Sequence, residues 1–272
     1  MRRPVKIIVS AILILFCLIQ LVPFYLALTT AFKDQSDLSS TWALPLQGAT
    51  LDNFASAIDD GNIFRAILNS AIVTVVVTFL ACILGAMAAY PLARRRTIVN
   101  QGVTLLTLGV MMVPPLSILV PLYSMLNDMH LLNTYPGVIL PLLCLALPQA
   151  IFLYTQFMRS VPLSMEEAAL VDGASRLQTF FRVIMPLLAP VTATVVILTA
   201  IHVWNEFALS SYIMTSSDMR TLAPSIAAFF GGQGSDVNAA VAASLLGVVP
   251  VIIAYVFLQR YFMKGMLAGA EK

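Results

Sequence analysis

The sequence has few charged side chains: Asp, Glu, Lys and Arg make up 10% of its 272 residues, against about 25% in a typical soluble domain. Apolar residues make up 60%, above the about 45–50% of soluble domains, and the mean hydropathy is +0.92. So few charges cannot cover a water-facing surface of this size. The formal net charge of +2 is too small for a nucleic-acid-binding protein, so no nucleic-acid partner is expected. The composition indicates an integral membrane protein.

Residues that bind metals or catalyse reactions are also scarce. The three cysteines stand singly in apolar runs without metal-ligand spacing. His202 and Glu206 form H-x-x-x-E rather than the H-E-x-x-H of zinc proteases. The phosphate-binding loop G-x-x-x-x-G-K-[ST] and the nucleophile motif G-x-S-x-G are both missing from the sequence. We therefore expect no catalytic residue, no metal site and no cofactor in this chain.

Long charge-free stretches are what the sequence does have. A transmembrane helix needs about 20 mostly apolar residues, and the first stretch is too long for a signal peptide, so it is interpreted as a retained span. The prediction is an all-α, polytopic membrane protein, forming a single transmembrane domain over 1–272. Its six expected helices cover about 7–32, 66–92, 102–126, 136–158, 187–213 and 238–259.

The placement of basic residues predicts the orientation, because cytoplasmic flanks retain Lys and Arg. One side of the expected spans holds 12 of the 15 basic residues: Arg2, Arg3, Lys6, Arg94, Arg95, Arg96, Arg159, Arg176, Arg182, Arg260, Lys264 and Lys272. The other side holds Lys33, Arg65 and Arg220, together with most of the acids. Both termini and the 159–186 loop are therefore expected in the cytoplasm of a multi-pass protein of the cell (inner or plasma) membrane.

The 159–186 loop begins with the signals of a short capped helix. Glu167 stands three residues after Ser164, the spacing of a capping box. A helix is predicted from about Met165 to Asp172, and Gly173 is expected to end it in the left-handed conformation.

A second capping box follows at once, formed by Ser175 and Gln178. It opens another helix, which Pro186 is expected to end. Two consecutive capped helices with small-residue faces suit insertion into a groove of a cytoplasmic partner better than a plain solvated connector.

The same loop resembles the EAA signature of permease subunits in binding-protein-dependent ABC importers. The resemblance lies in Glu167-Ala168-Ala169, Gly173 and Val183-Ile184-Met185-Pro186, where Val183 and Met185 replace the usual Ile and Leu. Further similar elements are Asn69-Ser70, Trp204-Asn205-Glu206-Phe207 and the tail Gly265-Met-Leu-Ala-Gly269-Ala270. Together they cover nearly the whole chain and are similar to the second, shorter permease of the maltose/multiple-sugar family.

This resemblance implies a type I ABC importer permease-like fold and a set of partners. These are a second, homologous permease subunit, an ATP-binding cassette ATPase dimer that binds ATP and Mg, an extracytoplasmic solute-binding protein and membrane lipid. The loop would transmit closure of the ATPase. The implied coupling residues are Glu166, Glu167, Ala168, Ala169, Asp172, Gly173 and Ala174.

Glu206 is the one acidic residue inside an expected span, where an acid should face the bundle interior or a water-filled cavity. On a continuous helix His202 would share its face. The polar and aromatic stretch either lines a passage for a hydroxylated solute or joins helices through buried hydrogen bonds. The predicted path residues are Asn69, His202, Trp204, Asn205 and Glu206. No span holds an Arg or Lys suited to an anionic substrate, which favours a neutral one.

The expected external segment 214–236 ends in a glycine-rich tip, which the resemblance implies contacts the solute-binding protein through Gly231, Gly232, Gln233 and Gly234. On the sixth expected span, Ala239, Ala243 and Gly247 form a small-residue stripe for packing within the bundle or against a subunit. The sequence thus favours the permease of an ATP-driven sugar importer. The alternatives are an ion-gradient-driven secondary transporter and a permease for a non-sugar solute.

Overall fold

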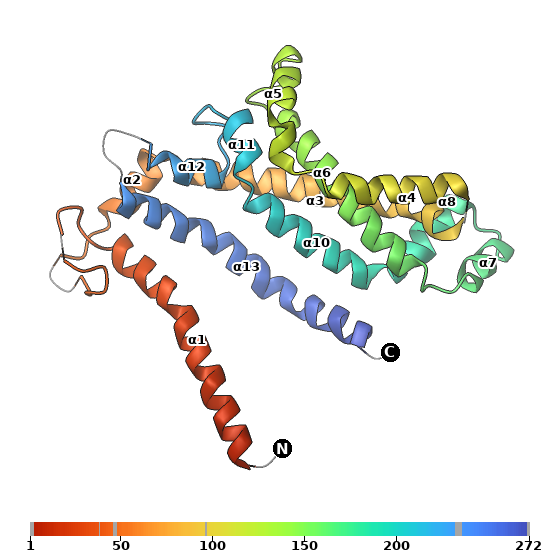
Figure 1. The fold of residues 1–272 in the computed structure, drawn as a ribbon, viewed down its shortest axis with the longest axis horizontal. Helices are drawn as coiled ribbons and strands as arrows, with labels where there is room; N and C mark the ends of the chain where they lie inside the picture. Colours follow the sequence, from red (N-terminus) through yellow and green to blue (C-terminus); the bar gives the residue numbers. More distant parts are fainter. Residues whose placement is uncertain (1–2, 38, 46–47, 96, 232–235, 271–272) are drawn as a thin grey trace. The chain divides into compact units, whose positions relative to one another are not determined.

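The structure is a computed structural model that describes residues 3–37, 39–45, 48–95, 97–231 and 236–270. Within these residues the regular elements are helices, with one isolated β-bridge between Lys33 and Ala49 (Figure 1). The predicted all-α fold is thereby confirmed. In chain order the elements are α1 (Arg3–Ala31), α2 (Asp52–Asp59), α3 (Ile63–Arg94), α4 (Ile98–Met111), the 3₁₀ turn η1 (Pro115–Ile118), α5 (Leu119–Asp128), α6 (Tyr135–Met158), α7 (Ser164–Val171), α8 (Arg176–Thr179), the π-helical η2 (Phe180–Ile184), α9 (Met185–Leu187), α10 (Ala189–Trp204), α11 (Ala208–Ile213), α12 (Leu222–Ala228) and α13 (Val237–Ala270).

Four helices are long and apolar enough to cross a membrane, and they correspond to the first, second, fourth and sixth predicted spans. They are Val9–Ala31, Ile63–Arg94, Tyr135–Met158 and Val237–Phe257. Two bent helix pairs also meet these criteria, so the described residues provide six spans when each pair counts as one. The number six therefore depends on the two bent pairs.

The third predicted span, 102–126, is wrong as a single straight helix. Its two halves, Ile98–Met111 and Pro115–Asp128, meet at 92°. The break lies at Pro114 and Pro115, because neither proline can donate a backbone hydrogen bond. A residue before proline also avoids the helical region, and Pro114 accordingly has ψ 127°.

The fifth predicted span, 187–213, also differs from a continuous helix. It follows a bend of 75° between Arg176–Leu187 and Ala189–Trp204, and it is interrupted again before α11. The expectation that Pro186 ends the preceding helix is wrong. Pro186 lies in the first turn of α9 instead, after a π-helical turn in which the Met185 amide donates to the Phe180 carbonyl.

The chain forms two compact units. Unit 1 comprises 1–64 and 224–252, and unit 2 comprises 65–223 and 253–272. Unit 1 is organised around the end of α1, where Asn53 of α2 is buried and donates hydrogen bonds to the carbonyls of Ala31 and Lys33 at 2.9 and 2.7 Å. Lys33 is buried as well, and its ammonium donates to the Ser39 hydroxyl and the Ser40 carbonyl.

The loop after α1 carries two acids whose pKa values lie below the usual range. The Ser36 side chain and then its backbone amide donate hydrogen bonds that lower the pKa of Asp34. Ser39 lowers the pKa of Asp37 in the same way. Hydrogen bonds to a carboxylate favour its charged form, so both acids stay ionised where unit 1 turns back after α1.

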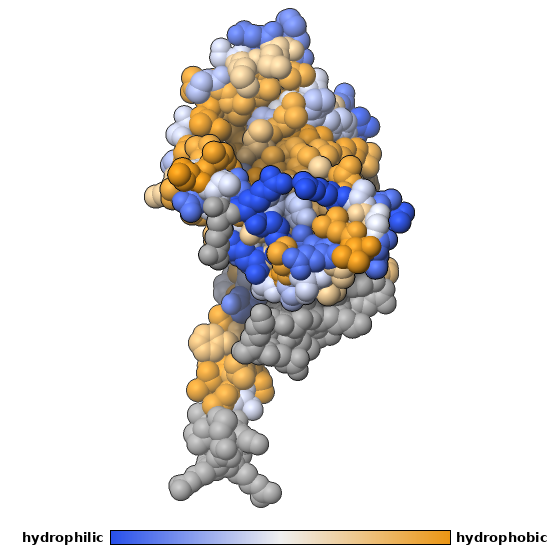
Figure 2. All heavy atoms as spheres, turned by 90° about the vertical axis from the view of Figure 1, so that its right-hand side faces the viewer, coloured by the Kyte–Doolittle hydropathy of each residue, from blue (hydrophilic) through white to orange (hydrophobic). Residues whose placement is uncertain are grey.

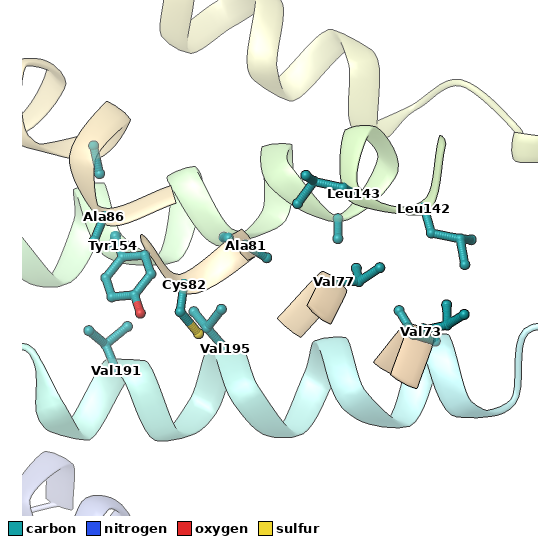
Figure 3. Close-up of a cluster of buried hydrophobic side chains, with 14 of the residues drawn as sticks. Val73, Val77, Ala81, Cys82, Ala86, Leu142, Leu143, Tyr154, Val191 and Val195 are labelled. Atoms are coloured by element: carbon teal, nitrogen blue, oxygen red, sulfur yellow. The ribbon is translucent and has the colours of Figure 1, made fainter. Parts of the chain in front are cut away.

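The core of unit 2 lies where α3, α6 and α10 meet. Figure 3 shows its apolar side chains, which include Val73 and Val77 on α3, Leu142 on α6 and Val195 on α10. Tyr154 of α6 is fully buried, and its hydroxyl donates to Thr192 of α10 at 3.0 Å. A buried tyrosine hydroxyl normally requires such a partner, so this bond fixes α6 against α10.

Gly85 sets the distance between α3 and α6, which yields a testable prediction. A Cβ at Gly85 would lie 2.8 Å from the Cβ of Ala150 on α6. Ala150 has no flexible side chain that could give way, so Gly85→Leu should force the two helices apart. Overpacking of this kind costs about 1–3 kcal/mol, and we expect a lower midpoint of thermal unfolding for the purified protein in detergent.

Gly102→Ala is the matched control, because nothing lies within 4 Å of a Cβ at Gly102 on α4. Alanine is favoured over glycine in a helix by about 0.5–1 kcal/mol, so this variant should keep or raise the unfolding midpoint. Equal midpoints for the two variants would contradict the close approach of α3 and α6.

Candidate functional site

The first helix of the 159–186 loop forms as predicted but begins differently. α7 spans Ser164–Val171, and its N-cap is Leu163, which makes no side-chain cap hydrogen bond. The predicted capping box of Ser164 and Glu167 is therefore wrong. The amides of Glu166 and Glu167 donate to the Leu163 carbonyl at 2.9 and 3.1 Å, so the backbone satisfies them without a side chain.

The turn after α7 agrees with the sequence prediction. Gly173 has a φ of +83°, a conformation that costs little only for glycine. The Gly173 amide donates to the Leu170 carbonyl, and the Ala174 amide donates to the Ala169 carbonyl at 3.0 Å. This pair of bonds is a Schellman motif, which ends α7 sharply.

The second capping box is confirmed. The Ser175 hydroxyl accepts from the Gln178 amide at 3.3 Å, and the Gln178 side chain accepts from the Ser175 amide at 2.8 Å. α8 starts directly behind this box. The predicted unit of two short helices joined by a glycine turn is therefore present.

Glu166 ties α7 to the last turn of α3. Its carboxylate accepts from the Arg94 Nε at 2.6 Å and from the Tyr90 hydroxyl at 2.7 Å. Glu166 is 5% exposed, and a buried charge of this kind is stable only when paired. We refer to Tyr90, Arg94 and Glu166 as the Arg94 network.

Arg94 also holds the chain that leads into the loop. Its Nη1 donates to the carbonyls of Met158 and Val161 at 2.9 and 3.0 Å. The ring of Tyr90 packs edge-on against Phe180 of η2, with ring centroids 5.5 Å apart. The Arg94 network thus contacts the exit of α6, the connecting turn, α7 and η2.

The outer face of the loop is open and mixed in character. The other predicted coupling residues are exposed or half-buried. Those exposed are Glu167, Ala168, Asp172 and Gly173, and those half-buried are Ala169 and Ala174. Large apolar side chains are exposed beside them, and Val171 is 87% exposed. Figure 2 looks onto this end of unit 2, where hydrophilic residues surround small apolar groups. Such a face can contact a partner through both charge and apolar surface.

The predicted path residues after α10 do not lie on one continuous helix. α10 ends at Trp204, so His202 and Glu206 do not share a helical face as expected. The Glu206 carboxylate accepts from the amides of Leu209 and Ser210 at 2.7 and 2.9 Å and from the Ser210 hydroxyl at 2.6 Å. An acid stabilises a helix N-terminus, so Glu206 holds the start of α11.

The remaining residues of this stretch differ in exposure. His202 and Asn205 are exposed and Trp204 is half-buried. The Asn205 side-chain amide donates from Nδ2 to the Ile201 carbonyl at 2.8 Å. Their role in a substrate path stays a prediction.

Asn69 occupies an internal network. It is fully buried, donates to the carbonyls of Asp218 and Arg220 at 2.9 Å each, and accepts from the Tyr135 hydroxyl at 2.8 Å. These bonds fix the segment after α11 to α3 and α6. Asn69 therefore joins segments in this structure, and its role in the path remains a prediction without support from the geometry.

Among the predicted contacts of a solute-binding protein, Gly231 is exposed, while Gly232, Gln233 and Gly234 lie outside the described residues. Within the described part of the chain, no group of three or more His, Cys, Asp or Glu side chains is arranged to hold a metal ion.

Sequence reasoning missed Tyr90 and Arg94 as parts of this site. Arg94 stands in a basic triplet that indicated only orientation, and nothing in the triplet distinguishes a buried arginine from an exposed one. The available signal is the spacing of Tyr90 and Arg94, four residues apart and hence on one face of α3.

Comparison with known proteins shows which family this chain resembles in sequence. Residues 81–267 match the family model described as binding-protein-dependent transport system inner membrane component. The chain is 36% identical to the melibiose/raffinose/stachyose import permease protein MelC of Bacillus subtilis, covering 92% of this chain and 91% of that protein. It is 38% identical to the diacetylchitobiose uptake system permease protein NgcG of Streptomyces coelicolor, with 92% and 83% covered.

A solved structure shows the same fold. A bacterial ABC transporter involved in the import of the acidic polysaccharide alginate contains a chain that superposes with a TM-score of 0.80. The match covers 96% of this chain and 99% of that one at 23% identity. With its membrane-spanning helices, the chain is a multi-pass protein of the inner membrane, and it belongs to the family of binding-protein-dependent transport system inner membrane components.

Proposed function

We propose that this chain forms half of the translocation pathway of an ATP-driven carbohydrate importer. A second, homologous permease supplies the other half, and an extracytoplasmic solute-binding protein delivers the sugar. An ATP-binding cassette dimer binds ATP and Mg and hydrolyses the nucleotide, while this chain contributes no catalytic residue and no cofactor of its own. The chain acts by changing conformation when the ATPase moves.

The observation that carries the proposal is the construction of the 159–186 loop. Two short helices are fixed by a Schellman motif and a capping box, and their outer face exposes Glu167, Asp172 and Val171. This loop docks in a cleft of the ATPase. Both chain termini and this loop lie in the cytoplasm, in line with the basic residues near them.

Relatives and composition support a neutral carbohydrate as the substrate class. MelC and NgcG are named for melibiose/raffinose/stachyose import and for diacetylchitobiose uptake. Arg94, the basic residue at the end of α3, is already paired with Glu166 and is not free to bind an anionic solute. His202, Trp204 and Asn205 supply the aromatic and hydrogen-bonding groups that suit a sugar.

The two alternatives differ in what they predict. A secondary transporter would work without an ATPase and stop when ionophores collapse the ion gradient, and family membership argues against it. The ligand preference of the solute-binding protein that co-purifies with this chain distinguishes a sugar permease from a permease for a non-sugar solute. Binding of an amino acid or an inorganic anion, but no sugar, would contradict the proposed substrate.

Gly173 provides a test of coupling through the loop. Gly173→Val places a β-branched residue at a φ of +83°, and the left-handed conformation costs non-glycine residues about 1–2 kcal/mol. The end of α7 should unwind while the membrane helices remain intact. We expect normal membrane insertion, and import into proteoliposomes that falls much more than ATP hydrolysis does.

Gly173→Asn is the matched control, because asparagine tolerates the left-handed conformation and a Cβ there meets nothing within 4 Å. This variant should import at close to the wild-type rate. If Gly173→Val binds the ATPase and imports normally, the coupling assignment is wrong.

Glu206 tests the polar stretch. Glu206→Ala removes three hydrogen bonds from the start of α11, and loss of a helix cap costs about 0.5–2 kcal/mol. We expect the unfolding midpoint and the import rate to fall together. His202→Ala is the comparison, since His202 is exposed and its loss should leave the midpoint unchanged. A wild-type midpoint for Glu206→Ala would show that the capping bonds do not matter.

A further inference from the structure

The attachment of α7 to the rest of unit 2 is unusual for a helix. Of its eight residues, all of them described, Glu166 is the one that is buried. Short helices in proteins are normally held by an apolar face packed on the core. The buried contact of α7 is instead a carboxylate, and its partners Tyr90 and Arg94 both belong to α3.

The end of α3 is itself fixed. The Asn100 side chain on α4 donates to the carbonyls of Pro91 and Arg95 at 2.9 and 2.8 Å, which satisfies acceptors left open at a helix C-terminus. α3 runs from this end for 32 residues, along the core formed by Val73 and Val77. If α7 is displaced, the bonds of Glu166 would therefore transmit that displacement to α3, a long and well-packed helix.

Stability alone does not account for a buried ion pair here. Taking two charges out of water costs about as much as their attraction returns, and apolar residues of similar size often stabilise a protein equally well. The side chains of Arg94 and Glu166 are 13% and 6% exposed. Arg94 Nη2 is buried without a hydrogen-bond partner among the described residues. What the network provides is a directed attachment, because Arg94 presents rigid, planar donors to Glu166 and to two carbonyls.

We propose that Arg94 and Tyr90 are positioning residues that bind α7 to the end of α3 through Glu166, so that motion of the ATPase is passed from the 159–186 loop to α3. This inference rests on the proposed function, since it presupposes that the loop docks on an ATPase. Neither residue touches substrate or nucleotide. They act by keeping α7 and α3 in one orientation during the transport cycle.

The test compares three variants of the complete importer in proteoliposomes: Arg94→Met, Glu166→Met and the double variant. Each single change leaves a buried charge without its partner, so assembly with the ATPase should fall. The double change removes both charges, and assembly should recover. The number of solute molecules imported per ATP hydrolysed should nevertheless remain below the wild-type value by about 2- to 30-fold, the range for residues within a coupling network.

Arg95→Gln is the matched control. Arg95 is next to Arg94 in sequence, but its side chain is exposed. Within the described residues the Arg95 side chain makes no hydrogen bond or ion pair, in contrast to that of Arg94. The ratio of import to hydrolysis in this variant should equal the wild-type ratio. A wild-type ratio in the double variant overturns the proposal, because the loop would then be coupled without the Arg94 network.

A second variant decides the matter if the double variant does not assemble. Tyr90→Phe removes the hydroxyl that donates a hydrogen bond to Glu166 but keeps the ring against Phe180. A lowered ratio in this variant supports the proposal, and an unchanged ratio overturns it. Failure of the proposed function is distinct, because the wild-type chain would then neither bind an ATPase nor import solute with ATP.

Discussion

A buried carboxylate needs a partner of opposite charge, and this requirement determines where the loop between α6 and α10 attaches. Glu166 is paired with Arg94 at 2.6 Å and bonded to Tyr90, while the rest of α7 is open or half-buried. The exposed residues Glu167, Val171 and Asp172 are consequently free for a partner. One face of a two-turn helix thus contacts the membrane domain while the other is exposed, which fits the proposed role in transmission.

The breaks in the membrane helices depend on how backbone hydrogen bonds are satisfied. Pro114 and Pro115 interrupt the third span, and after the interruption at Trp204 the amides of Leu209 and Ser210 donate hydrogen bonds to the Glu206 carboxylate. Non-helical backbone inside a membrane protein is tolerated where other groups satisfy it. Glu206 is thereby explained without assigning it to the solute path, although a second role there stays a prediction.

Composition was sufficient to predict the all-α membrane fold, and local rules predicted the turn at Gly173 and the cap at Ser175. Both motifs depend on residues close in sequence, so the pattern alone specifies them. The predicted Ser164 box does not form, because the Leu163 carbonyl already accepts from the Glu167 amide. The pairing of Glu166 with Arg94 joins residues 72 positions apart, and no local pattern predicts such a contact. Pro114 and Pro115 mark the position of one bend in the sequence, but no local pattern specifies the angles of 92° and 75°.

The central claim is that α7 and α3 move as one body, and a distance between them tests it most directly. Nitroxide labels at Met165 and Val75, both exposed on these helices, would be placed in a chain whose exposed cysteines Cys17 and Cys144 are serine. We predict one distance distribution in the nucleotide-free and ATP-bound importer, and a broader one after Arg94→Met with Glu166→Met. A wild-type distance that shifts between the two nucleotide states would contradict the account.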